Sequence, residues 1–232
     1  MLMNTGKFTG KAQAYAAARP GYPDQAIAYI RSLVPQNAVF ADIGAGTGKF
    51  TELIARHGYE IYAVEPNDDM REQLAVTLAP FDNVRIVNGT AEATTLPNDG
   101  VDVVVCAQAL GWFDLDSFRA ECIRIGKPGV TVIALYNDTP GDNHTPAGHR
   151  LSSKQAAQVF FKNPTVRTFP NPILYSRERW IQKQASISDN PRRSEPGYDE
   201  YITKVNEMFD RYNINGFLRE NLTTIVYHEG AY

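Results

Sequence analysis

A glycine-rich turn follows a short apolar segment and has the composition of a ligand-binding turn. Residues 39–43 are apolar except for Asp42, and they run directly into Gly44-Ala45-Gly46-Thr47-Gly48. A helical pattern then begins at Lys49. A glycine turn between a strand and a helix lies at the carboxyl edge of a parallel sheet, where backbone N–H groups can approach a ligand closely. The sequence therefore predicts a ligand site at this turn.

Two common ligands of such turns fit this sequence poorly. A phosphate-binding P-loop requires GxxxxGK[ST], but the glycine before Lys49 comes one residue too early after Gly44, and Phe50 stands where the magnesium-binding hydroxyl belongs. A dinucleotide-binding turn requires GxGxxG or GxGxxA, and its third small residue would fall at Lys49, whose long side chain obstructs close packing of helix on strand. An NAD-dependent oxidoreductase therefore remains only as a minor alternative.

Two acidic residues favour a third kind of ligand. Glu65 follows the predicted strand 60–64 and lies 17 positions after Gly48, where a carboxylate can accept hydrogen bonds from two ribose hydroxyls. Asp42 stands just before the glycines, which suits a ligand with amino-acid and ribose groups and no pyrophosphate. S-adenosylmethionine is such a ligand. The alternatives are that Asp42 only caps the next helix and that Glu65 only marks a turn.

Several separated segments resemble, in the same order, the class I S-adenosylmethionine-dependent methyltransferases, and in particular their small-molecule type, often described as methyltransferase type 11. The segments are Tyr15-Ala16-Ala17-Ala18-Arg19-Pro20-Gly21-Tyr22-Pro23, residues 42–48, Val64-Glu65-Pro66-Asn67, Gly89-Thr90-Ala91-Glu92, Gln108-Ala109, Trp112-Phe113-Asp114 and Lys127-Pro128-Gly129. Residues 176–227 also look similar to the end of these proteins, less specifically.

The resemblance implies a set of cofactor-binding positions. Two residues, Tyr15 and Arg19, belong to an N-terminal segment that covers the cofactor. The others are expected at the methionine moiety (Asp42, Gly44, Ala45 and Gly46), at the ribose (Glu65), around the adenine (Pro66, Asn67, Met70, Ala91 and Glu92) and near the reactive sulfonium (Gln108 and Ala109). Glu92 lies in an expected surface loop and could instead be merely solvated.

Four aromatic residues are expected to line the acceptor pocket, namely Tyr22, Trp112, Phe113 and Tyr136. Ligands of open α/β sheets bind outside the carboxyl ends of the strands, so Trp112 and Phe113 there suit a pocket as well as a core. A carboxylate acceptor is ionised at neutral pH and needs no general base, whereas a hydroxyl or an amine would need one. The pattern therefore favours methyl transfer to a small molecule, such as a carboxylate or another oxygen nucleophile.

The sequence contains no clear general base. Relatives commonly carry a histidine before the Trp-Phe pair, and this chain has Gly111 there. His144 and His149 lie in the connection after residue 135 and could supply a base or could simply be solvated. The four histidines and the acids show no metal-ligand spacing, so no metal is expected. A non-catalytic S-adenosylmethionine-binding regulatory protein therefore stays open as an alternative.

The elements that position these residues alternate between strands and helices. Strands are predicted at residues 39–43, 60–64, 84–87, 102–107, 130–135 and 223–227, and helices at 23–34, 49–57, 68–78, 115–125, 153–161, 177–184 and 199–212. The expected fold is α/β: a Rossmann-like, seven-stranded, mostly parallel sheet with helices on both faces and an insertion or lid after strand 5. One methyltransferase domain is expected over residues 1–232, with a cofactor cover (1–22), a core (23–136) and a lid with closing strands (137–232).

The composition fits a soluble globular protein with a small-molecule partner. The chain has 232 residues, 43% of them hydrophobic, and a net charge of −3, which argues against nucleic acid as a partner. No apolar stretch is long enough to span a membrane. The two cysteines, Cys106 and Cys122, are not spaced as a metal or disulfide motif, and a reducing cytoplasm is expected for a monomer or homodimer. Lys7, Lys11 and Arg19 are followed by no acid before residue 24, which faintly suggests a transit peptide.

Overall fold

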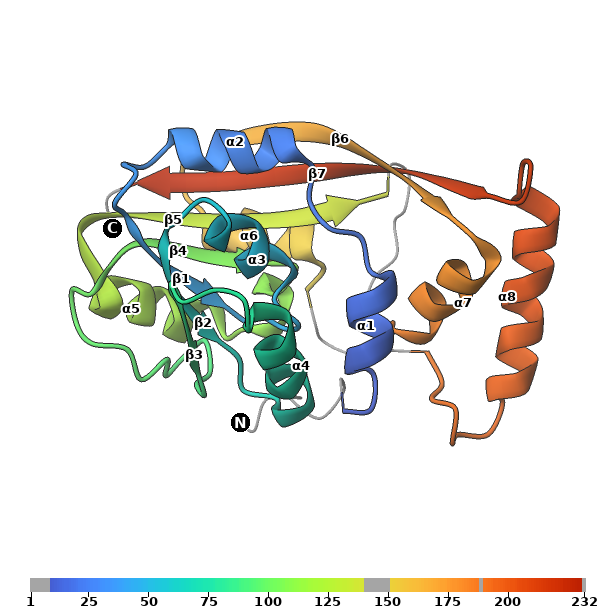
Figure 1. The fold of residues 1–232 in the computed structure, drawn as a ribbon. Helices are drawn as coiled ribbons and strands as arrows, with labels where there is room; N and C mark the ends of the chain where they lie inside the picture. Colours follow the sequence, from blue (N-terminus) through green and yellow to red (C-terminus); the bar gives the residue numbers. More distant parts are fainter. Residues whose placement is uncertain (1–8, 140–150, 188–189, 231–232) are drawn as a thin grey trace.

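A single seven-stranded sheet organises the computed structural model, which describes residues 9–139, 151–187 and 190–230 (Figure 1). The strand order is β3-β2-β1-β4-β5-β7-β6. The strands are β1 (Val39–Ile43), β2 (Glu60–Val64), β3 (Val84–Val87), β4 (Val101–Ala107), β5 (Gly126–Asp138), β6 (Thr165–Tyr175) and β7 (Leu218–Gly230). The first five pair in parallel, whereas β7 runs antiparallel to both β5 and β6. The prediction of a mostly parallel, seven-stranded sheet is confirmed.

Helices cover both faces of this sheet, as expected. One face carries α2 (Asp24–Ser32), α3 (Lys49–Ala55) and α4 (Asp68–Leu78), and the other carries α5 (Leu115–Ile125) and α6 (Ser153–Phe160). The central strand β4 is apolar almost throughout because both of its faces are buried. Val103 and Val105 pack toward α2 and α3, while Val104 and Cys106 pack toward α5.

The residue pattern does not predict the N-terminal helix α1 (Ala12–Ala18), the short 3₁₀ helix Leu110–Trp112 or the edge strand β6. A physical reason is found for β6. It contains Pro170 and Pro172, which normally argue against a strand because proline has no N–H to donate to a neighbour. β6 forms the edge of the sheet and pairs only with β7. Its outer side faces no other strand, so the N–H groups that the prolines lack are not needed there. The strands β5 and β7 are also longer than predicted, since they pair with each other along most of their length.

The N-terminal helix α1 (Ala12–Ala18) packs against α7 (Arg177–Ala185), which in turn packs against α8 (Tyr198–Tyr212). Figure 1 shows α1 beside α7, on the side of the molecule toward which the arrows of β4 and β5 point. Lys11 Nζ donates to the carbonyls of Ile187 (2.6 Å) and Asn190 (2.8 Å), and Arg19 Nε donates to Ser186 Oγ (2.9 Å). Cations interact favourably with the C-terminal end of a helix. Lys11 and Arg19 therefore hold α1 against the end of α7.

Polar side chains from three strands, two of them buried and one half-buried, hold the chain just after α1. Asn137 on β5 and Asn171 on β6 both donate to the carbonyl oxygen of Gly21, each at 3.0 Å. The oxygen of the Asn137 amide accepts from Thr224 Oγ1 on β7 (2.6 Å) and from Asn171 Nδ2 (3.1 Å). Buried polar groups are tolerated only when they are hydrogen-bonded. Here both asparagine amides bind the same acceptor, the carbonyl oxygen of Gly21. This cluster therefore fixes the position of the neighbouring Tyr22.

We expect Asn171→Ala to lower the free energy of unfolding by about 1–3 kcal/mol, because two hydrogen bonds of a buried amide are lost. Urea unfolding measures the effect. A matched control is Val166→Thr, a change to another β-branched residue at an exposed position of the same strand, which should alter stability by no more than about 0.5 kcal/mol. Equal stability of Asn171→Ala and the wild type would show that the cluster does not hold the Gly21 segment.

Candidate active site

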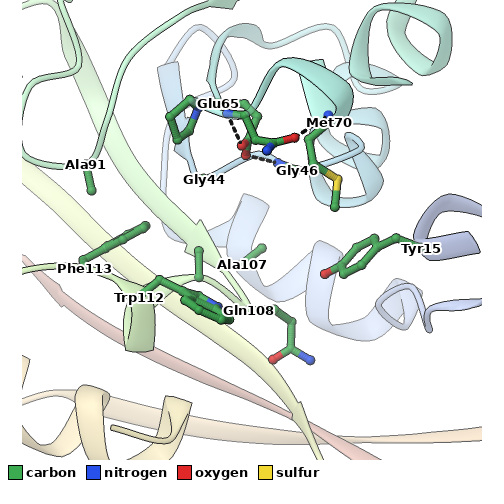
Figure 2. A pocket seen from close by; sticks show the side chains of 13 residues that line it. Tyr15, Gly44, Gly46, Glu65, Met70, Ala91, Ala107, Gln108, Trp112 and Phe113 are labelled. Carbon is green, nitrogen blue, oxygen red and sulfur yellow. Dashed lines mark hydrogen bonds between the residues drawn. The ribbon is translucent and has the colours of Figure 1, made fainter. Parts of the chain in front are cut away.

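A pocket opens where β1, β2 and β4 end, at the carboxyl edge of the parallel strands. This first pocket is lined by Tyr15, Gly44, Gly46, Glu65, Pro66, Asn67, Met70, Ala91, Ala107, Gln108, Ala109, Trp112 and Phe113. Figure 2 shows Glu65 and Met70 on one side of it, Trp112, Phe113 and Gln108 on the other, and the Tyr15 ring reaching in from α1. The pocket therefore combines an apolar slot with one carboxylate.

The carboxylate of Glu65 is held in place by backbone N–H groups from two different turns. Its Oε2 accepts from Gly46 N and its Oε1 accepts from Asn67 N, each at 2.9 Å (Figure 2). Glu65 is only 7% exposed, and this burial raises its pKa, although the two N–H groups partly oppose the rise. Each oxygen keeps a free lone-pair direction. The group can thus accept further hydrogen bonds from a diol in the pocket.

The glycine turn lies so close to the segment after β4 that one of its positions excludes any side chain. Gly44 has φ +71°, and a Cβ there would come within 2.8 Å of the Cβ of Ala109 and 3.2 Å of the Phe113 ring. The amides of Gly44 and Ala45 both donate to the carbonyl of Val64, at 2.9 and 3.0 Å. These contacts place the bare backbone of the turn beside the pocket, as the sequence predicts.

The carboxyl group of Asp42 is fully buried behind the turn. Its Oδ2 accepts from Thr51 Oγ1 at 2.6 Å, whereas its Oδ1 has no hydrogen-bond partner among the described residues. Burial raises the pKa of this group to about 7, the Thr51 hydrogen bond opposes the rise, and the nearby charge of Glu65 adds to it. The hydroxyl oxygen of Thr47 is likewise buried without a partner among the described residues. Two unsatisfied acceptors next to a glycine turn suit a ligand that brings a cation or an N–H donor.

Gln108 adopts a backbone conformation that few non-glycine residues take. Its φ is +61°, and its N–H donates to the carbonyl of Leu135 at 2.9 Å. Such a conformation costs on the order of 1–3 kcal/mol and is found preferentially at functional sites. It aims the side chain of Gln108 at the point where the first pocket meets a second one. No sequence pattern predicts this strain, because a glutamine carries no signal for positive φ.

The second pocket adjoins the first and is more polar. It is lined by Tyr15, Arg19, Pro20, Tyr22, Gly44, Ala45, Gly46, Thr47, Lys49, Phe50, Ala107, Gln108, Trp112, Asn137, Asp138, Thr139, Lys183, Ile187, Glu220 and Leu222. The two pockets share six residues: Tyr15, Gly44, Gly46, Ala107, Gln108 and Trp112. They are therefore two chambers of one site that meet beside Gln108 and Trp112.

Most of the residues predicted from the sequence come together in these two pockets. The first contains Tyr15, Gly44, Gly46, Glu65, Pro66, Asn67, Met70, Ala91, Gln108, Ala109, Trp112 and Phe113, and the second adds Arg19, Tyr22 and Ala45. Asp42, Glu92 and Tyr136 line neither. The Glu92 carboxylate accepts from Asp114 N at 2.9 Å, and Tyr136 is buried with its ring stacked 6.0 Å from that of Tyr227.

Several residues of the second pocket carried no local signal in the sequence. Lys183, Glu220 and Leu222 come from α7 and β7, far along the chain from the glycine turn. Lys49, which sequence reasoning treated only as an obstacle to a dinucleotide, lines this pocket, and its Nζ donates to the carbonyl of Ala16 at 2.6 Å. His144 and His149 lie outside the described residues. Within the described part of the chain, no group of three or more His, Cys, Asp and Glu side chains could hold a metal ion.

Comparison with known proteins indicates that the chain is a methyltransferase. Residues 41–134 match the family described as "Methyltransferase domain". The chain is 38% identical over 126 residues to an uncharacterised methyltransferase-like protein of Schizosaccharomyces pombe, an alignment that covers 53% of this chain and 48% of that protein. It is 33% identical over 214 residues to a Dictyostelium discoideum protein named as a methyltransferase, covering 91% of this chain and 74% of that protein.

The fold is shared with solved structures at low sequence identity. The YcgJ protein of Bacillus subtilis superposes with a TM-score of 0.59 at 20% identity, covering 90% of this chain and 98% of that one. The sheet order and the turn-bound carboxylate define a class I S-adenosylmethionine-dependent methyltransferase fold, and the chain belongs to the methyltransferase family. The cofactor of this class is S-adenosylmethionine.

The chain spans about half the length of the first curated relatives that it matches. Among the described residues, no helix is long and apolar enough to cross a bilayer.

The buried Asp42 should make the stability of the ligand-free protein depend on pH. Its pKa is raised from an ordinary 3.8 to about 7, so between these values the folded protein holds a proton that the unfolded chain has lost. The contribution of this group to stability is therefore present below about pH 4 and is lost as the pH rises to about 7. At about 1.4 kcal/mol per pKa unit, the loss amounts to at most about 4 kcal/mol.

The measurement compares the wild type with Asp42→Asn, since other carboxylates also titrate in this range. Free energies of unfolding from urea titrations at several pH values give the difference between the two proteins. We expect the stability of the wild type relative to the variant to fall as the pH rises from about 4 to 7 and to stay constant above that. A difference that is independent of pH would contradict the raised pKa.

Proposed function

We propose that this protein transfers a methyl group from S-adenosylmethionine to a small-molecule acceptor, and that the acceptor atom is an oxygen nucleophile such as a carboxylate. The observation that carries the proposal is the Glu65 carboxylate, which two backbone N–H groups orient at one end of an apolar slot. That slot continues into a second, polar pocket past Gln108 and Trp112. One chamber suits a nucleoside and the other suits an amino-acid tail together with an acceptor.

The residues present fit this cofactor. Glu65 would accept the two ribose hydroxyls, while Pro66, Asn67, Met70 and Ala91 would enclose the adenine. The glycine turn, with the unsatisfied hydroxyl of Thr47 in the second pocket, would face the methionine part, while Asp42 stays buried behind the turn. Arg19 and Tyr15 would close the site from α1. The loop that carries Asn67 is tied to the segment before α1, because Asn67 Nδ2 donates to Thr9 Oγ1 at 3.2 Å.

The proposed methyl transfer depends more on the alignment of the acceptor with the methyl group than on proton transfer. When bound, S-adenosylmethionine supplies an activated methyl group, so that an acceptor oxygen forms a bond to the methyl carbon as the carbon–sulfur bond breaks and S-adenosylhomocysteine leaves. Gln108 and Trp112 border the junction of the two pockets, where the acceptor must lie in line with that bond. Alignment at about 3–3.5 Å and exclusion of water supply much of the rate of such displacements.

No described side chain at the junction is suited to act as a base at neutral pH. Tyr15 and Tyr22 are the phenols nearest to it, and burial raises the pKa of both, that of Tyr22 strongly. Both therefore stay protonated and can donate hydrogen bonds to an acceptor oxygen. This arrangement favours an acceptor that is already ionised, which is why we propose a carboxylate.

Calorimetry with S-adenosylmethionine and S-adenosylhomocysteine tests the cofactor assignment. We expect micromolar dissociation constants, and no binding at about millimolar ligand would overturn the proposal. Release of S-adenosylhomocysteine in the presence of pooled small carboxylic acids then tests the transfer. Binding without release across such pools would favour a regulatory protein that binds the cofactor without using it, the alternative that the sequence left open.

Glu65→Ala should weaken the affinity for S-adenosylmethionine by about 1–3 kcal/mol, because two hydrogen bonds to a charged acceptor are lost. Glu60→Ala, at an exposed glutamate at the start of the same strand, is the matched control and should leave the dissociation constant unchanged. Glu65→Gln retains one acceptor oxygen and should lie between the two. An unchanged dissociation constant for Glu65→Ala would contradict the role of this residue.

A further inference from the structure

The second pocket is lined by more basic than acidic side chains. Arg19, Lys49 and Lys183 line it, against the two acids Asp138 and Glu220. Arg179 on α7 lies close behind, with its guanidinium 5.2 Å from the centre of the Tyr175 ring, while Lys183 Nζ lies 5.8 Å from the same centre. Cations from the end of the covering segment, from the start of α3 and from α7 thus lie in or near the second pocket.

Arg179 affects the ionisation of Lys49. Burial lowers the pKa of Lys49, and the charge of Arg179 lowers it further. The pKa of Tyr175 is raised by burial and by Glu220, while the charges of Arg179 and Arg19 act in the opposite direction. Like charges at this range cost free energy unless an opposite charge lies among them. The second pocket is therefore arranged to receive an anion.

The acids nearby offset only part of this charge. Glu220 forms an ion pair with Lys183 at 3.1 Å, in a setting where both side chains are largely buried. Glu52, whose charge raises the pKa of Lys49, is shared with Arg56, with which it forms an ion pair. The carboxylate of the cofactor's methionine part would neutralise one more cation, and Arg19 lies beside the turn to receive it. Asp138 is a third carboxylate, so the four cations Arg19, Lys49, Lys183 and Arg179 still exceed the carboxylates by one charge.

Lys49 is well placed to use that charge on a ligand. One of its three N–H donors binds the carbonyl of Ala16, which holds the side chain across the pocket and leaves two donors. Tyr22 and Phe50 pack edge to face beside it, with ring centres 5.9 Å apart, and supply an apolar wall. A carboxylate that is paired with an ammonium group is a poorer nucleophile than one that is not. The group that Lys49 binds is therefore better suited to anchor an acceptor than to receive the methyl group.

We infer that the acceptor carries an anionic group besides the atom that receives the methyl group, and that Lys49, backed by Arg179 and Lys183, binds it. This inference rests on the proposed function, because it concerns the acceptor chamber of the same site. It narrows the substrate class to small molecules with at least two acidic groups, or with one acidic group and a separate oxygen nucleophile. Lys49 is then a residue that determines acceptor specificity.

The test uses the protein saturated with S-adenosylhomocysteine and follows ligand binding by NMR titration. The probes are succinate, glutarate and phthalate, each with its neutral diamide, and butyrate and benzoate as monocarboxylates. We expect at least one dicarboxylate to bind about tenfold more tightly than its diamide and than the monocarboxylate of similar size. Preference for a monocarboxylate would instead mean that the anion at Lys49 is itself the methyl acceptor, which would overturn the two-group inference.

Variants test whether Lys49 causes the preference for a dicarboxylate. Lys49→Gln keeps a donor for Ala16 but removes the charge, and it should weaken the preferred dicarboxylate about tenfold while the affinity for S-adenosylhomocysteine stays unchanged. Lys49→Arg keeps the charge and should retain most of the binding. Arg179→Gln should show a smaller loss, and Lys204→Gln, at an exposed lysine of α8 that pairs with Glu200, should show none.

The failure of this inference and the failure of the proposed function look different. If S-adenosylhomocysteine does not bind, the proposed function is wrong. If it binds but every carboxylate behaves like its amide, or Lys49→Gln binds the dicarboxylate as the wild type does, the inference is overturned and the proposed function stands. A loss of S-adenosylhomocysteine affinity in Lys49→Gln that equals the loss for the dicarboxylate would assign Lys49 to the cofactor and would also overturn the inference.

Discussion

The site depends on one carboxylate that two turns hold at once. Glu65 follows β2, and its oxygens accept N–H groups from the turn after β1 and from the start of the loop before α4. This bridge adds to the backbone hydrogen bonds from Gly44 and Ala45 to Val64, which hold the glycine turn to the end of β2. Hydrogen bonds to a charged acceptor are stronger than neutral ones, so the bridge stiffens the floor of the first pocket. The same carboxylate keeps acceptor capacity for a ligand.

The covering segment, residues 9–22, is fastened to the rest of the molecule in several directions. Gly10 N donates to Asp69 at the start of α4, Lys11 binds carbonyls beyond the end of α7, and the Gly21 carbonyl is held by β5 and β6. Each attachment joins parts of the chain that are far apart in sequence. The second pocket exists only because these attachments bring α1, the glycine turn and α7 together, and that convergence is also what concentrates its positive charge.

The parallel half of the fold could be read from local patterns, because each strand there is a short apolar run and each helix has its own start and stop signals. The bounds of β1, β2, β3, α4 and α5 agree with those predicted. The antiparallel edge could not be read in the same way. Pro170 and Pro172 forbid a central strand, and only pairing with β7 at the edge of the sheet makes residues 165–175 a strand.

The sequence by itself determined the family and the residues around the glycine turn, since residue type and spacing along consecutive strands specify which groups meet at the carboxyl edge of a parallel sheet. Only the tertiary structure decided the strained conformation of Gln108, the burial of an unsatisfied oxygen on Asp42, and the charge interaction between Lys49 and Arg179. The physical reason is that backbone strain, desolvation and charge proximity arise between segments far apart in the chain, and no local pattern encodes the distance between them.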